Sequence, residues 1–451
     1  MISSAGRPSG YGGMALIAFV AAVVLTLLFG SGGDVGVAIL MLIVFCIVAL
    51  IGQHLKTDID PWLPSLLALA LLAKILGATA RYLALVHIFG VGDATGYHAF
   101  AESMAPFMRE FDIATVIDSL GRRGFGTNAT KVAITAFYVP YIPTMYGGFV
   151  ELASFSFLGQ IGFYSAFRRW VPADRLKPYA ILLFFFPTLL FWPSSVGKDA
   201  LMIGALGIAT AGFSAALQRY KLRDLLLAAV GMTIALLIRP HVALLLLAAV
   251  AVAMFIGKIP RAEAVRGTRT IVLVILSVAL LIGAPRAISL INIELTSEGI
   301  EDLIERQADN TNEGGSAVQG EAVTSPTQLP GATLRVLFRP LPNEARSMEM
   351  LASSVESLGL LLLILTLAPR MAARLRRSYR NPWVIASSVY VLGFVIAFST
   401  VLNLGILSRQ RAQVLPFLLA LIVALGWHGE SLTPIAGRPR TKVRELSGVH
   451  Q

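Results

Sequence analysis

A short polar stretch between two apolar runs carries side chains that could bind an anion. Its sequence is PSSVGKD, residues 193–199, and it is called the elbow below. Pro193 should end the helix before it, and either serine could cap the helix after it, which would place Lys198 and Asp199 in the first turn of the second helix. The free backbone N–H groups of such a turn, beside a lysine, could hold an anionic headgroup. The alternative is a capped hairpin in which Lys198 and Asp199 pair with each other or with water.

A second candidate group begins at Asp93, in the sequence GDATGYH at residues 92–98. If a helix starts there, Tyr97 and His98 follow Asp93 by about one turn. A carboxylate at a membrane surface with few cations beside it could act as a general base on a hydroxyl, with His98 as a helper and Tyr97 as a substrate contact. The alternative is that Asp93 is only the N-cap of the helix, because aspartate is common there.

The composition indicates which elements must position these residues. The chain has 451 residues, of which 56% are hydrophobic and 14% are charged, and its mean hydropathy is +0.74. This is too little polar material to cover a soluble protein of that size. The expected fold class is therefore all-α, a polytopic bundle of membrane-spanning helices with amphipathic or re-entrant external segments.

Cysteine, histidine and net charge exclude several classes of function. Cys46 is the only cysteine in the sequence, so a disulfide framework and a cysteine-rich metal site are excluded. The six histidines lack the spacing of a zinc site, and no cofactor is expected, although a divalent metal stays open. The net charge of +11 could suggest nucleic acid, but basic loops against anionic membrane lipids explain it better in a chain this apolar, so no nucleic-acid partner is expected.

The apolar runs predict twelve spans. They divide the chain into a bundle of nine spans (1–290), a partly flexible external loop (291–350), the C-terminal spans (351–428) and a basic cytoplasmic tail (429–451). Within the first part, 91–131 is expected to be an external loop and 132–146, interrupted by Pro140 and Pro143, a re-entrant segment. The predicted spans are 14–30, 36–53, 63–89, 147–167, 179–192, 200–217, 225–238, 242–257, 271–284, 351–367, 383–401 and 415–427.

The basic loops predict the orientation, because lysine and arginine favour the cytoplasmic side. With the most basic loops and both termini cytoplasmic, the elbow and Asp93 lie on the external face of a plasma membrane. Several cations then lie outside against this bias, and a bound anion would account for them, although each could instead meet lipid headgroups or an acidic residue such as Glu344 or Glu349. Together with the neighbouring histidine of the sequence RPH, these residues are Lys198, Arg239, His241, Arg339, Arg409, Arg411 and, as further candidates, Arg122 and Arg123.

Four charged residues fall within predicted spans or at their ends: Lys74, Arg81, Glu151 and Glu356. A charge at mid-membrane depth costs about 2.5–3.5 kcal/mol on insertion scales. The expectation is that the acids pair with Lys74 or Arg81 to hold the bundle together. Proton transfer in a transporter is the alternative.

Several of these short motifs together resemble the bacterial GT-C glycosyltransferases. The residues that carry the resemblance are Asp93 and Tyr97 after an early span, the elbow, the RPH turn at 239–241, and SRQRAQVLPF at 408–417 before the last span. The resemblance covers roughly residues 91 to 417. The chain is also similar to polymerases and ligases of the O-antigen type, which share external arginine loops. It departs from GT-C enzymes in placing Asp93 after the third span, where the family has its acidic residue after the first.

The resemblance implies transfer of a sugar from a polyprenyl-phosphate carrier to a glycan or lipid acceptor of the cell envelope, with Asp93 as the catalytic base. Independently, a lipid phosphate leaving group needs cations as its charge develops, and Lys198, Arg239, Arg409 and Arg411 could supply them. Two alternatives stay open. A lipid-linked oligosaccharide polymerase or ligase would depend on the arginines and need no acidic base, and a lipid or solute transporter would need charged residues along a path through the bundle.

Overall fold

The fold is all-helical, as the composition predicts. The computed structural model describes residues 19–24, 28, 35–57, 59–90, 92–121, 125–219, 221–258, 326–345, 347–401 and 403–427, and none of these forms a strand. The main helices are α2 (Val35–Leu55), α3 (Leu63–Ala84), α4 (Asp93–Arg109), α5 (Ile113–Asp118), α6 (Phe125–Tyr138), α7 (Met145–Phe167), α8 (Leu176–Phe185), α9 (Pro187–Phe191), α10 (Lys198–Arg219), α11 (Leu222–Ile238), α12 (Pro240–Ile256), α15 (Leu329–Phe338), α16 (Met348–Ser378), α17 (Pro382–Phe398), α18 (Leu404–Gln410) and α19 (Leu415–Leu421).

Four of the described helices are long and apolar enough to cross a membrane. They cover Gly36–Leu55, Leu63–Ile88, Lys198–Gln218 and Met348–Ser378. A fifth span results if Leu404–Gln413 and Leu415–Gly426, which are bent by 65°, form one broken span. The count of twelve stays a prediction. Helices of 17 residues, such as α11 and α12, reach only about 26 Å at 1.5 Å per residue, and the predicted span 271–284 lies outside the described residues.

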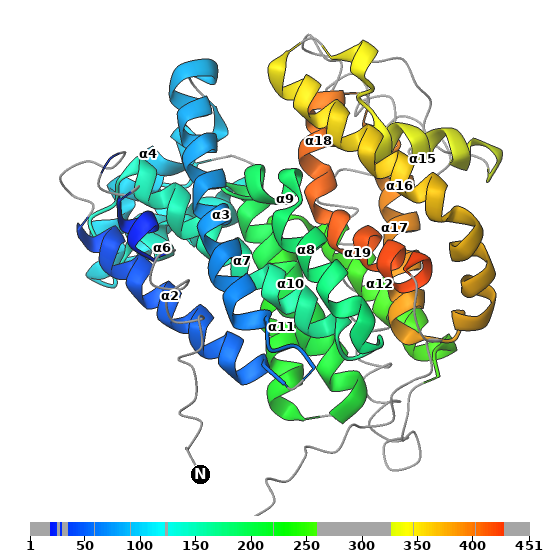
Figure 1. Ribbon diagram of the computed structural model, residues 1–451. Coiled ribbons are helices and arrows are strands. Elements are labelled where there is room, and N and C mark those ends of the chain that lie inside the picture. Colours follow the sequence, from blue (N-terminus) through cyan, green and yellow to red (C-terminus); the bar gives the residue numbers. More distant parts are fainter. Residues whose placement is uncertain are drawn as a thin grey trace, which may run out of the picture.

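Helix α10 lies at the centre of the bundle, between α7 and α11 (Figure 1). Its contact with α7 depends on glycines on both helices. A Cβ at Gly207 would lie 1.9 Å from the carbonyl oxygen of Gly159, and one at Gly162 would lie 2.4 Å from that of Gly207. Small residues of this kind allow helix backbones in a membrane to approach closely. The contact fixes α10, and with it the elbow at its start, against the core.

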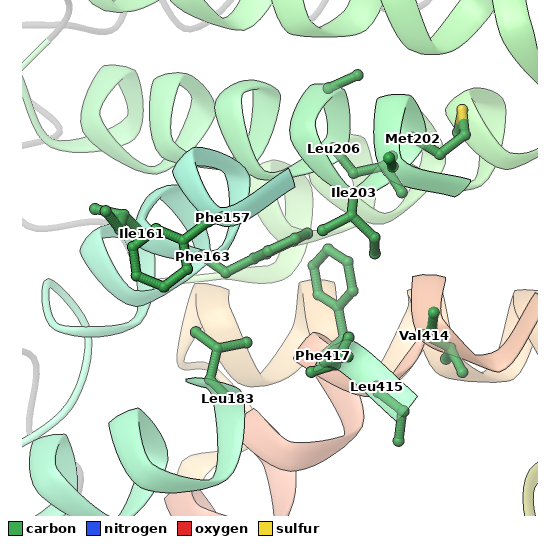
Figure 2. Packing of buried hydrophobic residues seen from close by; sticks show 14 of the residues in the cluster. Phe157, Ile161, Phe163, Leu183, Met202, Ile203, Leu206, Val414, Leu415 and Phe417 are labelled. Carbon is green, nitrogen blue, oxygen red and sulfur yellow. The ribbon is translucent and has the colours of Figure 1, made fainter. Parts of the chain in front are cut away.

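The hydrophobic core joins helices that are far apart in the sequence. Figure 2 shows Phe163 of α7, Leu183 of α8 and Ile203 of α10 gathered around Phe417 of α19. The ring of Phe417 also lies 4.2 Å from that of Tyr390 in α17, centroid to centroid. These residues are almost fully buried. The first and last parts of the chain thus form one body around α10.

Some predicted boundaries differ from the structure. The predicted span 179–192 is broken into α8 and α9 at Phe186, which has an extended ψ of 124° because the residue before a proline is disfavoured in the helical region. Residues 132–138 continue α6, and Pro140 and Pro143 lie in the turn before α7, so the predicted segment 132–146 covers the end of one helix, a turn and the start of the next. Helix α16 is longer than predicted and ends only at Ser378.

Parts of the predicted chain organisation lie outside the described residues. These are most of the predicted span 14–30, most of the predicted external loop 291–350, Arg122 and Arg123, and the tail 429–451.

Candidate functional site

The elbow is preceded by helix α9, whose two ends are completed by side chains from distant helices. Pro193 has no N–H, so the carbonyl of Leu189, four residues earlier, lacks its helical donor. Lys74 of α3 replaces that donor, with its Nζ 2.6 Å from the carbonyl oxygen of Leu189. At the other end, the free N–H of Thr188 donates to Glu356 Oε2 at 2.7 Å. Lys74 and Glu356 therefore do not pair with each other as expected, because each satisfies a backbone group of a broken helix.

The other two charges expected in this pairing are also engaged differently in their described contacts. Glu151 accepts a hydrogen bond from the Tyr141 hydroxyl at 2.8 Å. The guanidinium of Arg81 lies over the rings of Phe191 and Trp192. Glu151 thus has a hydroxyl partner, and Arg81 has aromatic neighbours besides its electrostatic interactions with Glu349 and Asp199.

The first serine of the elbow does not act as the sequence suggests in its described contact. The Ser194 hydroxyl donates to the carbonyl of Leu190 at 2.5 Å, so it closes α9 instead of capping α10. Helix α10 then begins at Lys198, which places Lys198 and Asp199 in its first turn, as predicted. The elbow thus presents these two charges from a backbone held by α3 and α16.

Asp199 is the centre of an ion cluster that joins four segments. Its carboxylate is 1% exposed and lies between two arginines: Oδ1 is 2.9 Å from Arg239 Nη1, and Oδ2 accepts from Arg409 Nε. Asp93, at the start of α4, is 71% exposed, and its Oδ2 lies 3.7 Å from Arg409 Nη1. A buried carboxylate shared by two guanidiniums fixes both cations, whereas the exposed Asp93 is free to exchange partners. The predicted residues Asp93, Asp199, Arg239 and Arg409 therefore lie together.

Lys198 and Tyr97 extend this cluster through Thr127. Lys198 Nζ donates to Thr127 Oγ1 at 3.0 Å, and Thr127 also interacts with the Tyr97 side chain. A Cβ at Gly197 would lie 3.9 Å from the Tyr97 ring and 4.0 Å from Arg409 Nη2, so α4, the elbow and α18 meet at this glycine. Burial, with a contribution from Asp93, raises the pKa of Tyr97, which keeps its hydroxyl protonated.

The cluster has one positive charge more than its carboxylates can neutralise. Lys198, Arg239 and Arg409 carry three positive charges, and Asp93 and Asp199 carry two negative ones. Lys198 interacts electrostatically with all four other members. This excess charge, beside an exposed carboxylate, can bind an anion and accept a proton in the same place.

The two predicted histidines have other neighbours. His98 Nδ1 lies 3.0 Å from the Tyr138 hydroxyl and Nε2 lies 3.6 Å from Glu102, while no described contact joins it to Asp93. Burial lowers the pKa of His98, so the ring is neutral near pH 7. His241 packs against Phe398, with 5.8 Å between ring centroids, and lies within the electrostatic field of Arg239.

Arg411 and Arg339 belong to a neighbouring structural contact. Arg411 is buried, and its Nη1 donates to the carbonyl of Leu337 at 2.8 Å and to Ser357 Oγ at 2.6 Å. Its Nη2 donates to the carbonyl of Arg339 at 3.0 Å. Arg339 in turn pairs with Glu344, whose pKa it lowers by hydrogen bonding. Arg411 thus ties α15 and the segment after it to α16, and Arg339 closes that segment on itself through Glu344, where sequence reasoning placed both arginines in contact with substrate.

Three further residues complete the site. Sequence reasoning missed one of them and gave the other two different partners. Thr127 links Lys198 to Tyr97, and nothing in its own sequence context indicates this. Lys74 and Glu356 were recognised as costly charges, and the missing N–H of Pro193 was the signal that could have given Lys74 its partner. Within the described ranges, no three His, Cys, Asp or Glu side chains cluster as metal ligands, so no residues are identified for the divalent metal that the sequence left open.

Comparisons of the chain with family models, curated proteins and solved structures give no match. The function is therefore inferred from the site alone.

Proposed function

We propose that the protein is a membrane glycosyltransferase that moves a sugar from a polyprenyl-phosphate carrier to a cell-envelope acceptor on the external face of the plasma membrane. The observation that carries the proposal is the ion cluster, in which Asp93, Lys198, Arg239 and Arg409 come together from segments up to 316 residues apart, and the buried Asp199 holds the two arginines. The excess cations suit a phosphate, and α10, which begins in the cluster, is apolar enough to span the membrane. Multiple spans with both termini cytoplasmic complete the proposed topology.

In the proposed reaction, an acceptor hydroxyl attacks the anomeric carbon of the sugar. The bond between this carbon and the phosphate oxygen breaks, and the carrier leaves as a phosphate with one more negative charge. Arg239 and Arg409, held by Asp199, stabilise this charge, and Lys198 adds a third cation. Asp93, exposed beside Arg409, takes the proton of the hydroxyl. Tyr97, protonated and next to Asp93, can donate a hydrogen bond to the substrate.

The experiment that tests this role compares Asp93→Asn with the wild type in membranes that synthesise the glycan. Asparagine keeps the shape of the side chain but cannot accept the proton, so transfer should fall by about 10²–10⁴-fold while the protein level stays the same. Wild-type activity in Asp93→Asn would refute Asp93 as the base.

A polymerase or ligase is the second candidate, and one observation favours it. The arginines of the cluster are much more buried than Asp93. This suits a site in which cations bind and stabilise the phosphate and no acidic base is required. Comparing the activities of the two single variants Asp93→Asn and Arg409→Ala separates the two functions. A polymerase should tolerate the first substitution much better than the second. The transporter alternative gains no support from Lys74 and Glu356, which bind backbone groups of α9.

A further inference from the structure

One face of α3 packs along α9 and places an arginine beside the elbow. Lys74, Gly77 and Arg81 are spaced by three and four residues, so they lie on the same side of the helix. Lys74 bonds to the carbonyl of Leu189, and a Cβ at Gly77 would lie 2.3 Å from the carbonyl oxygen of Leu190. The two helices therefore touch backbone to backbone, which fixes where the next turn of α3 places Arg81.

Arg81 is held beside the elbow by two aromatic rings. Its guanidinium carbon lies 4.8 Å from the ring centroid of Trp192 and 5.1 Å from that of Phe191, both within the range of a cation–π contact. These residues directly precede Pro193. Arg81 also interacts electrostatically with Arg409 and Asp199, so it lies within the field of the ion cluster.

An arginine inside a membrane span is costly and commonly marks a functional site. Arg81 lies in the span Leu63–Ile88 and is partly buried. The mechanism described above does not use it.

A carboxylate interacts with the cation at each end of this group, Arg409 at one end and Arg81 at the other. At one end, Asp93 lies 3.7 Å from Arg409. At the other, Glu349 interacts electrostatically with Arg81, and its Oε1 is buried without a hydrogen-bond partner among the described residues. A phosphate group offers a guanidinium more acceptor oxygens than a carboxylate does. Asp93 and Glu349 thus occupy two positions that phosphates could take.

We propose that Arg81 is a fourth cation of the anion site and that the site takes a diphosphate, with one phosphate at Arg239 and Arg409 and the other at Arg81. This inference rests on the proposed function and specifies the headgroup: the carrier is a polyprenyl diphosphate. A single phosphate would leave the carboxylate at one end in place, whereas a diphosphate replaces both.

The test measures binding of inorganic diphosphate and inorganic phosphate to the purified full-length protein in detergent by calorimetry, in phosphate-free buffer. Wild type should prefer diphosphate by about tenfold or more, since one added charge-assisted contact corresponds to at least that factor. Arg81→Gln should abolish most of this preference and change phosphate affinity less than about threefold. Arg81→Lys should restore part of it. Arg376→Gln, an exposed arginine near the far end of α16, is the matched control and should leave both affinities unchanged.

The outcomes separate this inference from the proposed function. An unchanged preference in Arg81→Gln, together with loss of both anions in Arg409→Gln, overturns the diphosphate assignment alone. If Arg409→Gln binds both anions as tightly as wild type, the anion site itself is refuted. Absence of binding by a wild-type protein that melts cooperatively also refutes both proposals.

Discussion

The contact between Lys74 and the end of α9 makes a prediction that depends on one missing hydrogen. Trp192 has helical backbone angles, φ −66° and ψ −49°, so an N–H at position 193 would point toward the carbonyl of Leu189. Pro193 lacks that N–H, and Lys74 Nζ supplies the donor at 2.6 Å. Lys74→Met keeps the length of the side chain and removes the donor. It should leave a buried carbonyl unpaired, at a cost of about 1–3 kcal/mol.

The background Pro193→Ala should reduce this cost, because alanine supplies the N–H that proline lacks. The difference between the cost of Lys74→Met in the two backgrounds, the coupling energy, should be about 1–2 kcal/mol. The assay is thermal unfolding of the four proteins in detergent, followed by tryptophan fluorescence, where about 1 kcal/mol corresponds to roughly 2–4 °C or less in a chain of this length.

Lys74→Arg is the control, since it keeps a donor, and it should unfold closer to wild type than Lys74→Met does. An equal loss of stability for Lys74→Met in the proline and alanine backgrounds would refute the role assigned to the missing N–H.

Two further predictions concern packing and pH. Gly207→Ala should destabilise the protein by about 1–3 kcal/mol or more, because its Cβ would lie 1.9 Å from the Gly159 carbonyl oxygen. The control is Gly359→Ala, where a Cβ meets no atom within 4 Å, and it should be neutral or stabilising in the same melting assay. Burial lowers the pKa of His98, so its contribution to stability is present above the unfolded pKa of about 6.5 and is lost as the pH falls toward the folded pKa. Between pH 7 and pH 5 the melting temperature of wild type should therefore fall more steeply than that of His98→Asn, and equal slopes would contradict the assigned burial effect.

Much of the helical arrangement follows from the sequence because it depends on local pattern. The apolar runs at 36–53 and 63–89 predict α2 and α3 within a few residues. An apolar run in a membrane must satisfy its own backbone hydrogen bonds, and a helix does so. The elbow is also local, because Pro193 lacks the N–H that would continue α9. The break at Phe186 was readable in principle from Pro187, which disfavours helix in the residue before it.

The composition of the site was predictable, but its internal contacts were not. Unexpected cations on one side of the membrane suggested a shared ligand, and Arg239 and Arg409 do meet in the structure. That Asp199 would be the buried anchor between them depends on packing between segments 210 residues apart, which no local pattern encodes. Arg411 differs from Arg409 by two residues, yet it binds backbone carbonyls because the helix turns it to the other side.

The most direct test of the central proposal is native mass spectrometry of the protein purified from membranes in mild detergent. If the ion cluster holds the phosphate of a carrier lipid, wild type should retain a species with the mass of a phosphorylated polyprenyl lipid. Arg409→Gln, which removes a cation without changing α3 or the elbow sequence, should lose most of it and keep the bound phospholipids. Equal retention of the polyprenyl lipid by both proteins, or retention of ordinary phospholipids alone by wild type, would contradict the proposal.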